Sequence, residues 1–225
     1  MKNMWLYAFI AVSIANLAGV ALQQQTLIFV TKPLLMPLLG GWLAMQTHHD
    51  PPRFSKRTVF AGLAFATMGD IFLLFGEQPI FFILGLLSFL LTHLSYIGAF
   101  SAITRDQKGY LRYHPLWFVP FLAYPVVLLW ILWPGIDLKI AVTIYAVVIT
   151  AMGLSVLNLY GHVKNAIFHS LMGGALLFML SDSLLAMRKF GTAGDWAPLA
   201  VMATYIAGQF FIVKGVRDAV VVKHG

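Results

Sequence analysis

Eight apolar stretches follow one another along this 225-residue chain, separated only by short polar connectors. They cover residues 4–22, 27–45, 58–75, 80–103, 115–133, 138–158, 164–187 and 196–215. A helix needs roughly 20 apolar residues to cross the hydrocarbon core of a bilayer, and each stretch has about that length. The sequence therefore predicts an all-α membrane protein, a bundle of about eight transmembrane helices.

The composition agrees with this class and leaves little room for anything else. Hydrophobic residues make up 60% of the chain and charged residues only 10%. Eight spans and their turns use nearly the whole length, so we expect a single integral membrane domain over residues 1–225 and no soluble domain. The chain has no cysteine, which excludes disulfides, thiolate nucleophiles and cysteine-ligated metals.

The distribution of basic residues predicts the orientation. With an even number of spans, one side of the membrane holds eleven basic residues and the other side three. The eleven are Lys2, Arg53, Lys56, Arg57, Arg105, Lys108, Arg112, Lys164, Lys214, Arg217 and Lys223, and the three are Lys139, Arg188 and Lys189. We therefore expect both termini in the cytoplasm, and in a bacterium the inner (plasma) membrane as location. The alternative for the N-terminus is a signal peptide cleaved after the first apolar run.

The net charge of +7 is explained by the same loops and chain ends. A nucleic-acid partner is therefore not expected. The partners that this composition favours are membrane lipids.

Three charged residues lie inside the predicted spans, namely Lys32, Asp70 and Asp182. Each costs roughly 2.5 to 3.5 kcal/mol on insertion scales, so each needs a reason and a partner. At about 1.5 Å of rise per residue, all three lie about 8 to 9 Å below the outer surface, and Asn16 reaches the same level. The sequence thus predicts a polar layer near one face of the membrane.

Two interpretations of the carboxyl groups remain open. In the structural one, Asp70 and Asp182 pair with Lys32 or cap a polar cluster that holds helices together. In the functional one, two acids and one lysine leave one acid without a counter-charge, and such a desolvated carboxyl favours the protonated form that a general acid requires.

The two aspartates occupy related local settings. Gly62 lies eight residues before Asp70, as Gly174 does before Asp182. This indicates a weak four-plus-four helix repeat, with halves at 1–112 and 113–225. Small residues such as Gly62 also allow helices to approach closely.

The second predicted span contains Pro33 and Pro37. Neither can donate a backbone hydrogen bond, so we expect this helix to kink and to expose carbonyl groups beside Lys32. Such an opening tends to line a cavity.

The histidines do not form a metal-binding motif. Of the seven, His93 lies within a span, where an intrahelical hydrogen bond is its ordinary state. The others fall in or near cytoplasmic loops: His48, His49, His114, His162, His169 and His224. No HExxH arrangement is present, and we expect neither a metal nor a cofactor.

Several segments, in order, are similar to one known family. They are residues 31–37 (TKPLLMP), 69–74 (GDIFLL), 89–96 with His93, and 178–183 (FMLSDS) with Tyr205 and Gln209 beyond. Together they resemble the YhhN family of multispan proteins, which includes the lysoplasmalogenases, over essentially the whole chain.

The resemblance implies an eight-helix membrane hydrolase that cleaves the vinyl ether bond of a lysoplasmalogen. It implies Asp70 and Asp182 as the catalytic pair, one as acid and the other as base. Vinyl ether cleavage begins with proton transfer to carbon and needs no metal or cofactor. The substrate-binding residues expected are Lys32, Asn16, Thr31, His93, Tyr205 and Gln209, with Lys32 and Asn16 as candidates for the lipid phosphate.

Three other functions compete with this one. A lipid or ion transporter would use Lys32, Asp70 and Asp182 as a polar relay. A metal-dependent membrane hydrolase would use the aspartates with histidines and would be sensitive to a chelator. A structural or assembly protein would need the charges only for packing.

For the hydrolase, the substrate expected is a lysophospholipid or an ether lipid.

Overall fold

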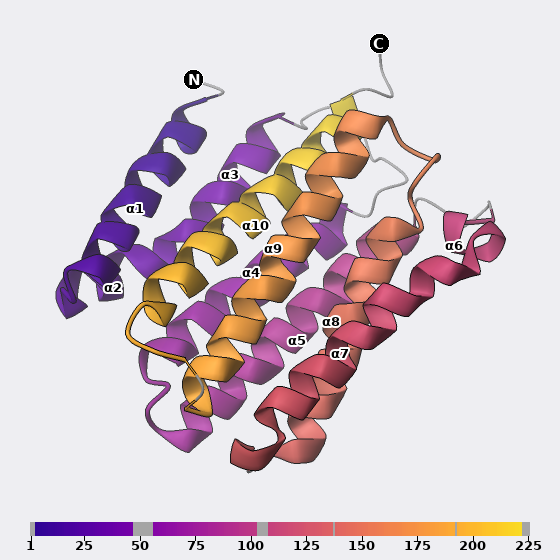
Figure 1. The fold of residues 1–225 in the computed structure, drawn as a ribbon. Helices are drawn as coiled ribbons and strands as arrows, with labels where there is room; N and C mark the ends of the chain where they lie inside the picture. The colour runs from indigo at the N-terminus through magenta and orange to yellow at the C-terminus, as the bar shows by residue number, and fades with distance from the viewer. Residues whose placement is uncertain (1–2, 47–55, 103–107, 137, 192, 222–225) are drawn as a thin grey trace. The chain divides into compact units, whose positions relative to one another are not determined.

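The computed structural model describes residues 3–46, 56–102, 108–136, 138–191 and 193–221, and these residues form helices joined by short turns (Figure 1). The α-helices are α1 (Met4–Ala21), α2 (Gln25–Thr31), α3 (Leu35–Gln46), α4 (Lys56–Leu74), α5 (Pro79–Ser101), α6 (Tyr110–Tyr113), α7 (Phe118–Leu132), α8 (Lys139–Leu157), α9 (Asn165–Lys189) and α10 (Ala197–Val221). Three one-turn 3-10 helices join them: η1 (Lys32–Leu34), η2 (Pro115–Trp117) and η3 (Trp133–Gly135). No strand occurs within the described ranges.

Apolar helices of this length are what a bilayer permits, because each helix satisfies its own backbone hydrogen bonds in hydrocarbon. Among the described residues, seven helical segments are long and apolar enough to cross a membrane. They are Met4–Ala21, Gln25–Gln46, Pro79–Ser101, Pro115–Gly135, Lys139–Leu157, Asn165–Lys189 and Ala197–Ala219. The 19-residue helix α4 is not among the seven and occupies the position of the third expected span. The prediction of an all-α multispan membrane protein is confirmed.

The second span is interrupted where its first proline lies. α2 ends at Thr31, the chain makes the 3-10 turn η1 around Pro33, and α3 begins at Leu35. A proline lacks the N–H group that would continue the α-helical ladder, which accounts for the break. The predicted irregularity beside Lys32 is therefore present.

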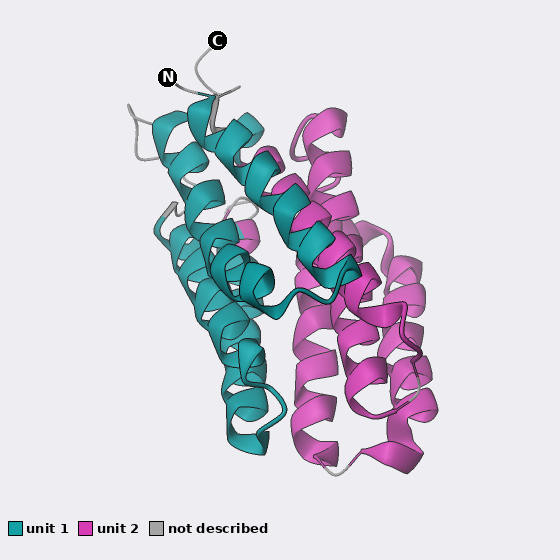
Figure 2. Cartoon of the chain, turned by 90° about the vertical axis from the view of Figure 1, so that its left-hand side faces the viewer, with its two compact units in different colours: residues 1–99, 217–225 teal, residues 100–216 magenta. Residues whose placement is uncertain are grey.

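The chain divides into two compact units (Figure 2). Unit 1 comprises residues 1–99 and 217–225, and unit 2 comprises residues 100–216. The boundary near the C-terminus falls inside α10, so this helix contributes residues to both units.

Within unit 1, glycines let the helices pack closely. A methyl group built on Gly62 of α4 would lie 2.6 Å from the ring of Tyr96 of α5, and one on Gly69 would lie 2.7 Å from the ring of Phe89. Thr92 of α5 also donates a hydrogen bond to the carbonyl oxygen of Gly62, over 3.2 Å. The close helix approach predicted from these small residues is confirmed.

Within unit 2, the backbones of α9 and α10 themselves lie close together. A methyl group on Gly174 would lie 2.7 Å from the backbone nitrogen of Ile212, and one on Gly208 would lie 2.9 Å from that of Phe178. Gly153 of α8 has the same function toward α7 and α9, because a methyl group there would lie 2.7 Å from Phe121 and 2.9 Å from Met179 Sδ.

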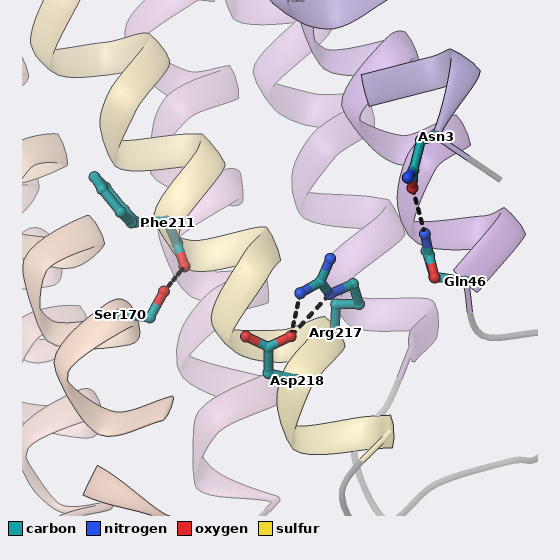
Figure 3. Close-up of polar contacts among 6 residues, drawn as sticks. All are labelled: Asn3, Gln46, Ser170, Phe211, Arg217 and Asp218. Atoms are coloured by element: carbon teal, nitrogen blue, oxygen red, sulfur yellow. Dashed lines mark hydrogen bonds and ion pairs between the residues drawn. The ribbon is translucent and has the colours of Figure 1, made fainter. Parts of the chain in front are cut away.

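A few polar contacts secure the helices away from the candidate site (Figure 3). In unit 2, the hydroxyl of Ser170 donates to the carbonyl oxygen of Phe211 over 2.9 Å. In unit 1, Arg217 pairs with its neighbour Asp218, and its guanidinium carbon lies 4.7 Å from the centre of the Trp42 ring.

Some predictions fall on residues that the structure does not describe. These residues are Lys2, His48, His49, Arg53, Arg105, Lys223 and His224, and they lie outside the described ranges. The cytoplasmic location of both termini and the four-plus-four repeat therefore stay predictions.

Candidate functional site

Asp70 is the charged centre of the candidate site in unit 1. It lies on α4 and is 1% exposed. Its Oδ1 atom lies 3.8 Å from Nζ of Lys32, whose side chain is 12% exposed. Two opposite charges in apolar surroundings stabilise each other, and removal of either would leave a buried charge uncompensated. One expected pair of intramembrane charges is therefore a real contact.

The broken second span places Lys32. η1 begins at this residue and packs against α4, so the interruption of the helix and the ion pair occur at one point. In an unbroken helix, the backbone N–H and carbonyl groups at this point would be hydrogen-bonded within the helix itself. Here a charged side chain and an irregular backbone segment share one polar region, as functional sites inside membranes often do.

Thr31 connects Lys32 to α1. Its hydroxyl donates to the carbonyl oxygen of Leu27 over 2.6 Å and accepts a 2.8 Å hydrogen bond from the amide of Asn16. Thr31 is 5% exposed and Asn16 is fully buried. The two residues predicted to bind substrate beside Lys32 thus form one hydrogen-bonded pair.

His93 is the fourth predicted site residue of unit 1. It lies fully buried on α5, in the turn between the aromatic rings that cover Gly69 and Gly62. The intrahelical hydrogen bond expected for its ring stays a prediction. A function in substrate binding stays a prediction.

Asp182 is the carboxyl group of unit 2. It lies half-buried on α9, and its Oδ2 atom accepts a 2.5 Å hydrogen bond from the hydroxyl of Tyr145 on α8. The next residue, Ser183, contacts a second phenol, because its Oγ atom lies 2.8 Å from the hydroxyl of Tyr124 on α7. Two tyrosines from neighbouring helices therefore converge on one turn of α9.

Tyr145 and Tyr124 were not among the residues selected from the sequence. Both lie within apolar stretches that read simply as spans. A tyrosine in the middle of a span must find a partner for its hydroxyl group, which was the available signal. Neither residue could be assigned to Asp182 in particular, because the sequence does not give the neighbours of α9.

The remaining two predicted residues lie on α10 in unit 2. Tyr205 is 3% exposed, and its ring packs edge-on against Phe178 of α9, with 5.6 Å between the ring centres. Gln209 is fully buried one turn further along. The contact of Tyr205 joins α10 to α9, and substrate binding by either residue stays a prediction.

The described residues offer no cluster of metal ligands. Over the part of the chain that the structure describes, no three His, Asp or Glu side chains gather in a way that could hold a metal ion. The chemistry available at the described sites is that of carboxyl groups with an ammonium and phenols beside them.

Comparisons with known proteins give the chain its relatives. A model of the YhhN family matches residues 27–216. Lysoplasmalogenase TMEM86A of Bos taurus is 29% identical over 189 residues, which are 79% of this chain and 73% of that protein.

Two further relatives bear the same activity in their names. Lysoplasmalogenase TMEM86B of Sus scrofa is 34% identical over 154 residues, covering 68% of this chain and 61% of that protein. A lysoplasmalogenase of Mycobacterium bovis is 27% identical over 188 residues, covering 82% and 69%. No solved structure matches this chain.

Proposed function

This chain belongs to the YhhN family, and we propose that it is an intramembrane lipid hydrolase that cleaves the vinyl ether bond of a lysoplasmalogen. The products would be a fatty aldehyde and a glycerophospho head-group. The proposal is supported by relatives named lysoplasmalogenase in mammals and in a mycobacterium.

The observation that carries the chemical part is that each of the two intramembrane aspartates is held by a donor side chain. Lys32 contacts Asp70, and Tyr145 donates to Asp182. Purely structural carboxyl groups in spans are expensive, and apolar residues of similar size would pack at lower cost. Functional use would account for the presence of both.

The reaction needs an acid and a base, which Asp70 and Asp182 would provide. The acid gives a proton to the alkene carbon that is not bonded to oxygen, which leaves an oxocarbenium ion at the other carbon. The base takes a proton from water as its oxygen attacks that ion, and a hemiacetal forms. The bond between the hemiacetal carbon and the glycerol oxygen then breaks. The base returns its proton to that oxygen and the former acid takes the proton of the hemiacetal hydroxyl, which gives the aldehyde and the glycerol hydroxyl and restores both carboxyl groups, with one water consumed for each bond cleaved.

The other site residues would bind the lipid. Lys32 carries the positive charge that a lipid phosphate requires, beside the carboxyl group that it contacts. Thr31, His93, Tyr205 and Gln209 would line the path of the substrate. No metal or cofactor is needed for the steps above.

The first experiment measures aldehyde release from lysoplasmalogen by the purified protein in detergent. A lysophospholipid with an ester at the same position serves as matched control, since general acid catalysis at an alkene carbon is impossible there. We expect aldehyde from the vinyl ether and no fatty acid from the ester, and the rate of aldehyde release should be the same with and without a chelator. Loss of activity with the chelator would favour the metal-dependent hydrolase.

The competing function is transport of a lipid or an ion. The broken span beside the Lys32–Asp70 pair favours it, because discontinuous helices also form transporter sites. The protein reconstituted in liposomes would then move lipid or cations across the bilayer without aldehyde release. Flux of this kind in a hydrolytically inactive protein would replace the hydrolase by the transporter.

The expected location is the inner membrane of a bacterium with both termini in the cytoplasm. Reporter proteins fused to each terminus test this orientation. Activity of a periplasmic reporter at either end would contradict it.

A further inference from the structure

The side chain of Asn16 has one half of its amide satisfied and the other half not. Nδ2 donates to Oγ1 of Thr31, whereas Oδ1 has no hydrogen-bond partner among the described residues. The side chain is fully buried. A buried polar atom of this kind costs about 1 to 3 kcal/mol, and folded proteins rarely keep one without a reason.

The orientation of this amide is fixed by its neighbour. The single hydroxyl hydrogen of Thr31 points to the carbonyl oxygen of Leu27, 2.6 Å away. The Thr31 oxygen can therefore only accept from Asn16, and only the NH2 group of Asn16 can be the donor. Rotation of the amide by half a turn would place two acceptors against each other, so Oδ1 is held facing away from the Thr31 hydroxyl.

The backbone around the pair is equally constrained. A methyl group built on Gly19 of α1 would lie 3.2 Å from Cγ of Leu27 and 3.3 Å from Cγ1 of Ile28 on α2. α1 and α2 therefore pack tightly one turn beyond Asn16. Thr31 precedes Lys32, which contacts Asp70, so one hydrogen bond and one peptide bond join Asn16 to the residue that contacts the proposed catalytic carboxyl group.

An amide oxygen is an acceptor, and this decides which ligand group it can bind. A deprotonated phosphate has only acceptors and would be repelled. The expected binding of phosphate by Asn16 is therefore not what the amide orientation supports. The ligand group must bring an N–H or O–H donor.

A lysolipid carries such a donor close to the bond to be cleaved. Its free glycerol hydroxyl is on the carbon next to the one that bears the vinyl ether oxygen. The amine of an ethanolamine head-group lies beyond the phosphate, much further from that bond, and a choline head-group has no N–H at all. The hydroxyl is also the group that disappears when a second acyl chain is attached.

We propose that Oδ1 of Asn16 accepts a hydrogen bond from the free glycerol hydroxyl of the substrate and so selects lysolipids over lipids with two chains. This inference rests on the proposed function and adds the residue that recognises the free hydroxyl of the lysolipid. A site that hydrogen-bonds a substrate hydroxyl discriminates strongly against analogues without it, because the protein atom is then left buried and unpaired.

The test compares two substrates with a choline head-group that differ at one position. One is the 1-alkenyl lysolipid with its free 2-hydroxyl, and the other is its 2-deoxy analogue, which is no larger and cannot donate a hydrogen bond at this position. For the wild-type protein, kcat/KM for aldehyde release should be about 100-fold higher with the free hydroxyl. In Asn16→Leu this preference should fall to within about threefold, because the acceptor is gone.

Ser13→Ala is the matched control. Ser13 is buried on the same helix, and its hydroxyl donates over 2.7 Å to the carbonyl oxygen of Phe9 in its own helix. This variant should keep the wild-type preference. Size-exclusion chromatography establishes that each variant is folded.

The outcomes separate the two claims. Equal rates for both substrates in the wild-type protein would overturn the inference while leaving the hydrolase in place, and this result needs no variant to fold. A full preference retained by folded Asn16→Leu would overturn it as well. No aldehyde from either substrate would instead reject the proposed function.

Discussion

Asp70 and Asp182 have the same local sequence pattern but different surroundings. Asp70 in unit 1 is 1% exposed and contacts the ammonium group of Lys32 beside a broken helix. Asp182 in unit 2 is half-buried on the continuous helix α9 and accepts a hydrogen bond from the neutral phenol of Tyr145. The pattern of glycine and aspartate therefore specifies helix packing, whereas the partner of each carboxyl group comes from elsewhere in the chain.

This difference predicts that the stability of the protein depends more on the side chain that contacts Asp70 than on the one that contacts Asp182. Lys32→Met leaves the buried Asp70 without its counter-charge and should lower the free energy of unfolding by about 3 kcal/mol. Thermal unfolding in detergent measures this loss. Adding Asp70→Asn to the same chain should restore most of the stability, and a double variant as unstable as Lys32→Met would show that the ion pair is not the cause.

For the glycines eight residues before each aspartate, the larger loss of stability on substitution is expected in unit 2. A methyl group on Gly174 meets backbone atoms of Ile212 and Gly208, whereas one on Gly62 meets the ring of Tyr96. Gly174→Ala should therefore destabilise the protein by about 2 kcal/mol, and Gly62→Ala by less, because a side chain yields more easily than a backbone.

Gly173 supplies the control for this pair. Nothing lies within 4 Å of a methyl group built there. Gly173→Ala should be neutral or stabilising by up to about 1 kcal/mol, since alanine favours the helix. Equal losses for the alanine variants at 173 and 174 would mean that the contact of α9 with α10 is not tight.

The phenol beside Asp182 should matter less for stability than the lysine beside Asp70. Tyr145→Phe removes one hydrogen bond to a carboxyl group, and we expect a loss of about 1.5 kcal/mol together with a fall in aldehyde release of about tenfold. If Tyr145 positions Asp182, the fold decrease in kcat should be larger than the fold increase in KM. An unchanged kcat would refute that function.

The smallest effect is expected one residue further along α9. Ser183 donates to the carbonyl oxygen of Met179 in its own helix and contacts the hydroxyl of Tyr124. Ser183→Ala should cost about 0.5 kcal/mol and leave aldehyde release within twofold of wild type. A loss as large as that of Tyr145→Phe would extend the functional part of unit 2 to this pair.

The sequence predicts the helices well and the contacts between them poorly. Apolar length and turn residues place the spans within a few residues, because the bilayer imposes one length scale on all of them. Pro33 likewise predicts the break at η1, since a proline acts on its own helix. The energetic cost of charge in hydrocarbon selects Lys32, Asp70 and Asp182 without any knowledge of the fold.

Partners across helices are a different matter. The pairing of Lys32 with Asp70 was one of two open possibilities, and the hydrogen bond from Tyr145 to Asp182 was not predicted at all. Helix neighbours depend on packing between side chains far apart in the sequence. The unsatisfied oxygen of Asn16 likewise emerges only when the hydroxyl of Thr31 is seen to point to Leu27.

The most direct test of the central claim is aldehyde release from lysoplasmalogen by Asp70→Asn and Asp182→Asn, each compared with the wild-type protein. Asparagine keeps the shape of the side chain but can act neither as the acid nor as the base. We predict that each variant folds, as judged by its elution in detergent, and loses at least about 1000-fold in kcat. A folded variant of either kind that releases aldehyde at the wild-type rate would contradict catalysis by these two carboxyl groups.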